Sequence, residues 1–185
     1  MQNEVSIFKM ISSLFEKHQV RVVLVGGYAL IANKVQRMTF DIDFMMTETD
    51  YSKIEKEILE MGYSVLNRQD AFVQLKSEKK GLRDLDFLMS DSNTIESLIS
   101  QGSEITIAGE TFFVPSPIHL IEMKLHSIAN NKNRELKDIP DIVQLMRMNT
   151  IDPNETRVRT LFQKYHLMEW YDRVVHAFKD WKWNE

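Results

Sequence analysis

The 185-residue sequence contains no cysteine and no long apolar run. Without cysteine there can be no disulfides, cysteine-ligated zinc or thiol catalysis, and the composition suits a reducing compartment. The longest apolar run, residues 22–32, is interrupted by Gly26 and Gly27 and is too short to cross a bilayer. Because the first residues also lack the basic start and apolar stretch of a signal peptide, we expect a cytoplasmic protein without a membrane segment.

Two common nucleotide-binding signatures are also missing. The sequence has neither the Gly-x-x-x-x-Gly-Lys pattern of a P-loop nor the Gly-x-Gly-x-x-Gly pattern of a Rossmann domain. The hydrophobic and charged fractions, 43% and 27%, are those of an ordinary globular protein. A net charge of −4 does not favour a general nucleic-acid binder, but it is compatible with carboxylates gathered around a metal ion.

Hydrophobic periodicity predicts an α/β half followed by an all-helical half. Three- and four-residue spacing predicts early helices, and alternation or β-branched runs predict strands and a hairpin. From residue 118 onward the pattern is helical throughout, and Pro115-Ser116-Pro117 marks the break, which predicts domains 1–115 and 116–185. The expected helices are 4–18, 28–33, 51–61, 93–100, 118–130, 137–148, 155–165 and 168–182; the expected strands are 21–25, 40–46, 63–66, 71–76 and 82–89, with a hairpin at 105–114.

Asp41 and Asp43 lie two residues apart in one expected strand. Because side chains alternate along a strand, the two carboxylates share one face, while Phe40, Ile42 and Phe44 are expected to face the core. Like charges so close repel unless the face is well solvated or a cation lies between them. Ligation by oxygen alone suits Mg²⁺ or Mn²⁺. A solvated strand face or a salt-bridged pair is the alternative.

A third carboxylate comes from a later apolar strand. Asp86 lies between Leu85 and Phe87, and if that strand pairs beside the one carrying Asp41, the acids can converge. Asp84 shares the face of Asp86 and is the competing candidate. A solvated edge with two outward acids remains the structural alternative.

Gly26 and Gly27 stand between a buried strand and an expected helix. A glycine pair there lets backbone amides approach a ligand closely, and phosphate is the obvious ligand, although such a turn also occurs with no ligand at all. Arg37 and Thr39, just before the acid pair, add a guanidinium fork and a hydroxyl group that could meet phosphate oxygens.

The order of these features resembles the nucleotidyltransferase superfamily related to DNA polymerase β. The resemblance rests on the Gly-Gly turn, the segment Arg37-Met-Thr39-Phe-Asp41-Ile-Asp43 and the later strand with Asp86. It looks most like the branch of AbiEii-type abortive-infection toxins and their uncharacterised relatives, in which a downstream helix carries a lysine and a later helix an aspartate preceded by basic residues. Lys124 and Asp138 match those two features.

The resemblance implies an α+β fold, with a mixed β-sheet flanked by helices and followed by a C-terminal helical bundle. It also implies magnesium- or manganese-dependent, two-metal nucleotidyl transfer in which Asp41, Asp43 and Asp86 hold the metal ions and Asp86 helps to deprotonate the acceptor hydroxyl. Nucleotide binding is implied for Gly26, Gly27, Arg37, Thr39 and Lys124. Lys124 would also neutralise phosphate charge in catalysis, and Asp138 would act as a positioning or base residue. For Lys124 the alternative is an ordinary exposed helix lysine, and for Asp138 an ordinary helix start.

The function that we expect is transfer of a nucleoside monophosphate from a nucleoside triphosphate, such as ATP, to a hydroxyl group. The acceptor could be tRNA, a protein or a small molecule such as an aminoglycoside or lincosamide. A toxin of this kind would have a cognate antitoxin as a partner. The alternatives are an antibiotic nucleotidyltransferase, a glycosyltransferase, whose Asp-x-Asp motif also binds a metal, and a non-catalytic binding or regulatory protein with the same fold.

Overall fold

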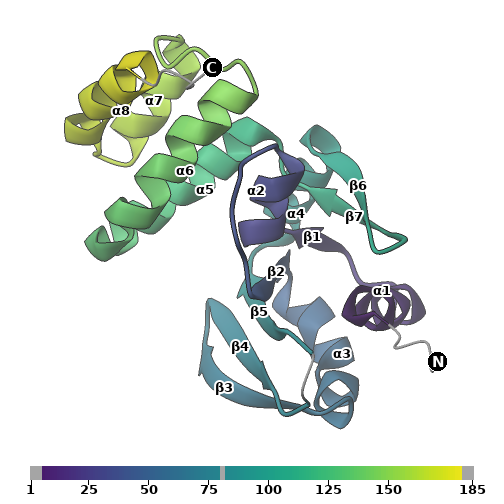
Figure 1. Cartoon of the computed structure of the whole chain (residues 1–185). Coiled ribbons are helices and arrows are strands. Elements are labelled where there is room, and N and C mark those ends of the chain that lie inside the picture. Colours follow the sequence, from purple (N-terminus) through teal and green to yellow (C-terminus); the bar gives the residue numbers. More distant parts are fainter. Residues whose placement is uncertain (1–5, 80–81, 181–185) are drawn as a thin grey trace. The chain divides into compact units, whose positions relative to one another are not determined.

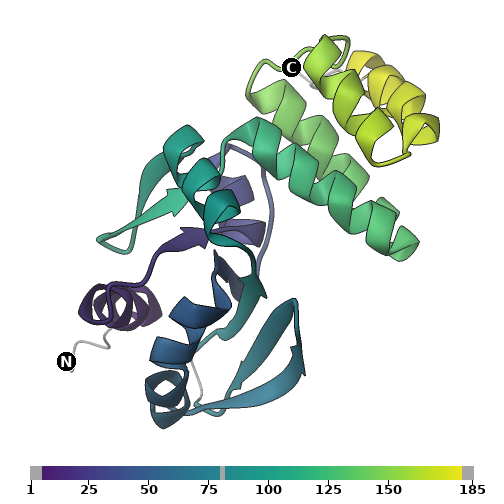
Figure 2. The ribbon, with the colours of Figure 1, turned by 180° about the vertical axis from the view of Figure 1, so that it is seen from behind.

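The structure, a computed structural model, describes residues 6–79 and 82–180 and divides the chain into two compact units. The first unit contains the described residues up to Ala29 together with those of Arg37–Pro115, and the second contains Leu30–Gln36 and the described residues from Ser116 onward. The ends of the helices expected at 4–18 and 168–182 lie partly outside the described residues. Figures 1 and 2 show the elements of each unit from opposite sides.

The element order combines strands and helices as expected, so the predicted α+β fold is confirmed. The helices are α1 (Ile7–Lys17), α2 (Gly26–Ala32), α3 (Glu48–Glu60), α4 (Ser92–Gln101), α5 (Pro117–Asn130), α6 (Glu135–Met148), α7 (Thr156–Lys164) and α8 (Met168–Asp180), with a 3₁₀ turn, Lys132–Arg134, before α6. The strands are β1 (Val22–Leu24), β2 (Asp41–Met46), β3 (Tyr63–Gln69), β4 (Phe72–Ser77), β5 (Asp84–Met89), β6 (Ser103–Ile107) and β7 (Glu110–Val114).

The first unit is built on a five-stranded mixed sheet in the order β1-β2-β5-β4-β3. The central pair, β2 and β5, is parallel, and the other neighbours in this sheet are antiparallel. A separate hairpin, β6 and β7, forms a second sheet. Parallel pairing of β2 with β5 brings the carboxylates of Asp41, Asp43 and Asp86 onto neighbouring strands, as the sequence prediction required.

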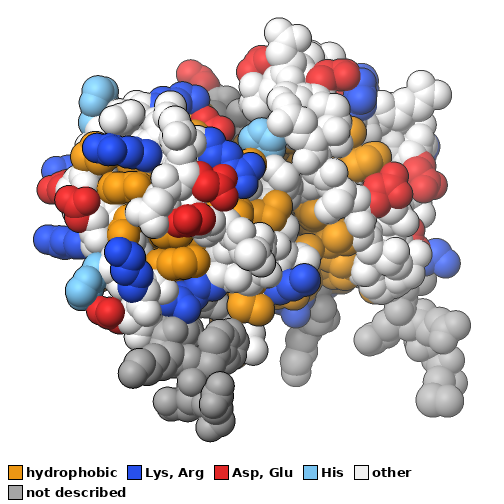
Figure 3. Space-filling model, turned by 90° about the horizontal axis from the view of Figure 1, so that it is seen from above, with side chains coloured by type: hydrophobic (Ala, Val, Ile, Leu, Met, Phe, Trp, Pro, Cys, Tyr) orange, Lys and Arg blue, Asp and Glu red, His pale blue; other side chains and the backbone are white. Residues whose placement is uncertain are grey.

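The second unit is helical, and it packs α5, α6, α7 and α8 around buried aromatic and aliphatic side chains. Phe162 is fully buried and meets Tyr171 edge-to-face at 5.5 Å between ring centroids. Pro117 occupies the first turn of α5, where its missing N–H costs nothing. On the face that Figure 3 shows, acidic and basic side chains are interleaved over the helices at the left. None of the helices in the described parts of the chain has the length and hydrophobicity needed to cross a bilayer.

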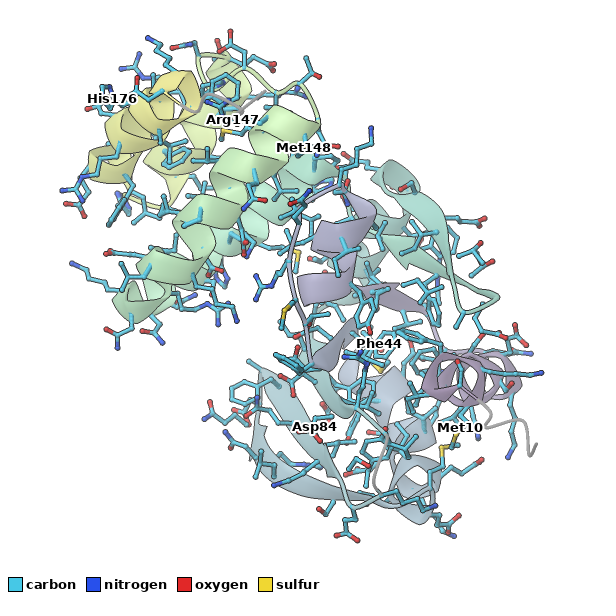
Figure 4. All side chains as sticks on the ribbon, in the orientation of Figure 1. Met10, Phe44, Asp84, Arg147, Met148 and His176 are labelled. Carbon is cyan, nitrogen blue, oxygen red and sulfur yellow. The ribbon has the colours of Figure 1, made fainter. Side chains whose placement is uncertain are left out.

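Alternation along β2 fixes which side chains enter the core of the first unit. Ile42 and Phe44 are fully buried, and Phe44, labelled in Figure 4, stacks on Phe87 of β5 at 5.8 Å between ring centroids. The expectation that Phe40 also faces the core is wrong. The strand begins at Asp41, so the alternation does not extend to Phe40, whose side chain is 74% exposed.

Candidate functional site

Three carboxylates converge on neighbouring strands of the sheet. The register of the parallel pair places Asp43 opposite Asp86 and Asp41 opposite Asp84. One oxygen from each of Asp41, Asp43 and Asp86 lies within 4.8 Å of the other two, and all three residues are half-buried. We call these three residues the acid triad. Such close carboxylates repel, and a hard divalent cation is the partner that this set of oxygen donors suits.

Each carboxylate of the acid triad also accepts a hydrogen bond from the protein. The Thr39 hydroxyl donates to Asp41 Oδ1 at 2.9 Å, and the Gln74 side-chain amide donates to Asp86 Oδ2 at 3.1 Å. The Gly27 N–H donates to Asp43 Oδ2 over a longer 3.4 Å. These donors fix the orientation of the carboxylates and leave other oxygen lone pairs for a ligand.

The electrostatics of Asp86 reflect this crowding. Burial raises the pKa of the Asp86 carboxyl, and the charges of Asp41 and Asp84 raise it further, while the hydrogen bond from Gln74 offsets part of the shift. A carboxyl that resists ionisation because of its neighbours is stabilised as an anion when a cation binds beside it.

Asp84, the competing candidate for the third acid, lies outside the acid triad. Its Oδ1 accepts the Ser77 backbone N–H at 2.9 Å, and its side chain is exposed. Figure 4 labels Asp84 on the sheet. The geometry therefore selects Asp86 rather than Asp84 as the residue that joins Asp41 and Asp43.

The glycine pair begins α2 and touches the acid triad. The helix starts at Gly26 rather than near Tyr28 as expected. Gly26 has φ +59°, and a Cβ atom added there would lie 1.9 Å from Asp43 Oδ2. A Cβ on Gly27 would lie 2.3 Å from the hydroxyl oxygen of Thr39. Glycine is required at both positions because the turn approaches these two side chains closely.

Two residues of this neighbourhood were missed by the sequence reasoning. In the sequence, Gln74 is one polar residue of an alternating strand. Only its register opposite Asp86 shows that its side-chain amide can hydrogen-bond to that carboxylate. Arg83 donates to the Thr39 carbonyl at 2.7 Å and lies over the Tyr28 ring at 5.7 Å from its centroid. Arg37 is half-buried two residues before Thr39, in the same unit.

Lys124 and Asp138 belong to an ionic network within the helical unit. The Lys124 ammonium donates to Asp138 Oδ1 at 2.8 Å and to Asp141 Oδ2 at 2.7 Å, and Arg134 Nε donates to Asp138 Oδ2 at 2.8 Å. Burial alone would raise the pKa of Asp138, but the hydrogen bonds and charges of Arg134 and Lys124 outweigh it and hold that pKa below its ordinary value. Because the Lys124 side chain is only 12% exposed, it is not an ordinary exposed helix lysine.

Solved structures share this fold at low sequence identity. ANT(2'')-Ia, solved in complex with adenylyl-2''-tobramycin, has 17% identity and a TM-score of 0.62 over 88% of this chain and 98% of its own. The lincosamide antibiotic adenylyltransferase LnuA, solved with lincomycin bound, has 20% identity and a TM-score of 0.54 over 75% of this chain and 94% of its own. An antigenic nucleotidyltransferase-like protein from Paracoccidioides brasiliensis has 13% identity and a TM-score of 0.56 over 92% of this chain and 89% of its own.

No curated protein matches the chain at a significant level. The solved structures, at 13–20% identity, show that the fold is shared. The family comparison is more extensive, because it spans both units. Residues 5–181 match the family described as uncharacterised nucleotidyltransferase, and the chain therefore belongs to that family.

Proposed function

We propose that the protein transfers a nucleoside monophosphate from a nucleoside triphosphate to a hydroxyl acceptor, with release of pyrophosphate, and that the acid triad holds the required divalent metal ions. The observation that carries this proposal is the convergence of Asp41, Asp43 and Asp86 beside a glycine turn, with carboxylate oxygens within 4.8 Å of one another. Membership in a nucleotidyltransferase family supports it.

The donor set fits magnesium or manganese. The acid triad offers oxygen ligands only, and its members are half-buried and crowded, so a cation relieves their repulsion. When bound, the metal ions would offset the charge of the triphosphate and stabilise the attacking and leaving oxygens.

The chain's own residues supply the remaining steps. Gly26 and Gly27 let the triphosphate approach the backbone beside Asp43, and Arg37 contacts phosphate oxygens. The Thr39 hydroxyl donates to a phosphate oxygen when its hydrogen turns away from Asp41. The acceptor hydroxyl oxygen forms a bond to the α-phosphorus, and the bond from that phosphorus to the bridging oxygen breaks. Pyrophosphate leaves, and the hydroxyl proton passes to the Asp86 carboxylate.

Lys124 and Asp138 belong to the helical unit. We assign phosphate neutralisation to Lys124 and a positioning or base role to Asp138. In the structure both residues contact the ionic network of the helical unit. In functional terms, residues 1–115 form the catalytic core and 116–185 the helical domain. A toxin of the AbiEii type acting in the cytoplasm on tRNA, with a cognate antitoxin, is the finer version of this proposal.

A second candidate function is modification of an antibiotic hydroxyl. It is favoured by the two structural relatives, one solved with an adenylylated tobramycin and the other with lincomycin. In this version ATP is the donor and the acceptor is a small molecule. A non-catalytic role is less favoured, because a binding protein has little use for three mutually repelling carboxylates.

The test is a transfer assay with each α-labelled nucleoside triphosphate, Mg²⁺ and either total RNA or candidate antibiotics. Three proteins are compared: the wild type, Asp43→Ala, and Asp84→Ala as the matched control on the same sheet face. We expect label transfer by the wild type and the control, and its loss in Asp43→Ala. Activity that survives Asp43→Ala would refute the assignment of the site.

A further inference from the structure

The row of side chains that contains Asp43 and Asp86 continues across two more strands. Gln74 of β4 pairs with Asp86, and Asn67 of β3 pairs with Gln74. Hydrogen bonds follow the same line, because Gln74 Nε2 donates to Asp86 Oδ2 at 3.1 Å and Asn67 Nδ2 donates to Gln74 Oε1 at 3.5 Å. The acid triad therefore adjoins a row of neutral amides that lies on the same face of the sheet.

A second row runs beside the first, and it is mostly apolar. Met45 pairs with Leu88, Leu88 with Phe72, and Phe72 with Gln69. Alternation places these residues on the face of Asp86, and Leu88 and Phe72 are half-buried rather than sealed in the core. The two rows together make a surface with hydrogen-bonding amides on one side and an apolar strip on the other.

The position of this surface relative to the nucleotide follows from the strand order. The glycine turn touches Asp43 on β2, at the β1 side of the acid triad, whereas β4 and β3 lie on the other side of β5. In an in-line displacement the acceptor approaches the α-phosphorus opposite to the leaving pyrophosphate. An acceptor that delivers its hydroxyl group to Asp86 therefore rests over β4 and β3.

The charges of this surface narrow the class of acceptor. Both β4 and β3 are described in full, and the one charged side chain that they place on this face is Lys76, because Arg68 pairs with Glu55 on the opposite face. A nucleic-acid backbone is bound by several cationic side chains, and a polyamine-like acceptor is bound by acidic side chains. On this face, β4 and β3 provide neither set. Side-chain amides can hydrogen-bond to hydroxyl groups, and the Phe72 ring can pack against the apolar side of another ring.

We propose that the open face of β4 and β3 binds the acceptor, and that the acceptor is an uncharged ring bearing hydroxyl groups, a sugar or glycoside. This inference rests on the proposed function. Gln74 then acts as a positioning residue for Asp86, while Asn67 and Gln69 hydrogen-bond to acceptor hydroxyl groups. Both of these β3 residues are exposed, so their substitution leaves the fold intact.

The experiment uses ¹⁵N-labelled full-length protein with Mg²⁺ and a non-hydrolysable nucleoside triphosphate analogue. Backbone signals of Gly26 and Gly27 report nucleotide binding, and side-chain amide signals of Asn67 and Gln69 report the acceptor surface. The probes are neutral disaccharides, a polycationic aminosugar and a cytidine-cytidine-adenosine RNA trinucleotide. The variants are Asn67→Ala and Gln69→Ala, with Arg68→Gln, which points to the opposite face, as the matched control.

We expect a neutral disaccharide to shift the Asn67 and Gln69 signals. The loss of one hydrogen bond should weaken its binding about fivefold in either alanine variant and leave it unchanged in Arg68→Gln. Shifts caused instead by the trinucleotide or the aminosugar, or no shift with any probe while the nucleotide still binds, would overturn this inference alone. Absence of nucleotide-induced shifts at Gly26 and Gly27 would contradict the proposed function as well.

Discussion

Substitution of Gly26 by alanine has two effects: backbone strain, which lowers stability, and displacement of Asp43, which lowers activity. Gly26 has φ +59°, and the left-handed backbone costs a non-glycine residue about 1–2 kcal/mol. The added Cβ would also lie 1.9 Å from Asp43 Oδ2, whereas ordinary contact begins at 3.4 Å. Asp43 must therefore move by about 1.5 Å, and a misplacement of that size in an active site lowers the rate by on the order of 10²-fold.

Gly109 provides the matched control for this substitution. It has φ +87°, but no atom lies within 4 Å of an added Cβ, so Gly109→Ala carries the backbone strain alone. Urea unfolding measures the strain in both variants, and label transfer with Mg²⁺ measures the site. We expect a loss of stability in both variants, at least as large in Gly26→Ala because of the added contact with Asp43, and a loss of transfer only in Gly26→Ala. If Gly26→Ala transfers label as fast as Gly109→Ala, contact between the turn and Asp43 does not matter for the reaction.

Three further predictions concern buried titratable groups. Lys124→Met should lower the free energy of unfolding by about 3 kcal/mol. This is the low end for a broken buried ion pair, because Arg134 remains bound to Asp138. A loss below about 1 kcal/mol, the value for an exposed ion pair, would contradict this prediction. The depressed pKa of Asp138 contributes stability that is full above its unfolded pKa and is lost as pH falls through its folded pKa. The stability difference between wild type and Asp138→Asn in urea should therefore shrink below about pH 4, and a constant difference would refute the linkage. Burial, helped by the charge of Asp84, raises the pKa of Tyr63 to about 12, so ultraviolet titration of Tyr63→Phe should lose a component near that pH.

The acid pair and its face could be predicted from the sequence because strand alternation is local. Asp41 and Asp43 need only a period of two to share a face, and family membership confirms the predicted nucleotidyltransferase. Asp86 lies beside Asp43 because β5 pairs with β2. The order of the motifs predicted this pairing, and the parallel register confirms it.

The remaining features depend on long-range pairing or on where an element begins. Gln74 contacts Asp86 because β4 pairs with β5 in one particular register, which no local pattern encodes. Phe40 looked like a core residue, but the strand starts one residue later and leaves it exposed. The bond between Lys124 and Asp141 depends on how α5 packs against α6, which no local pattern predicts.

Metal binding by the acid triad is tested most directly by a crystal structure with Mn²⁺ and a non-hydrolysable nucleoside triphosphate analogue, read by anomalous scattering from the metal. We expect anomalous peaks coordinated by the carboxylates of Asp41, Asp43 and Asp86, with the triphosphate against Gly26 and Gly27. Peaks elsewhere, or a bound nucleotide with no metal at the acid triad, would contradict it.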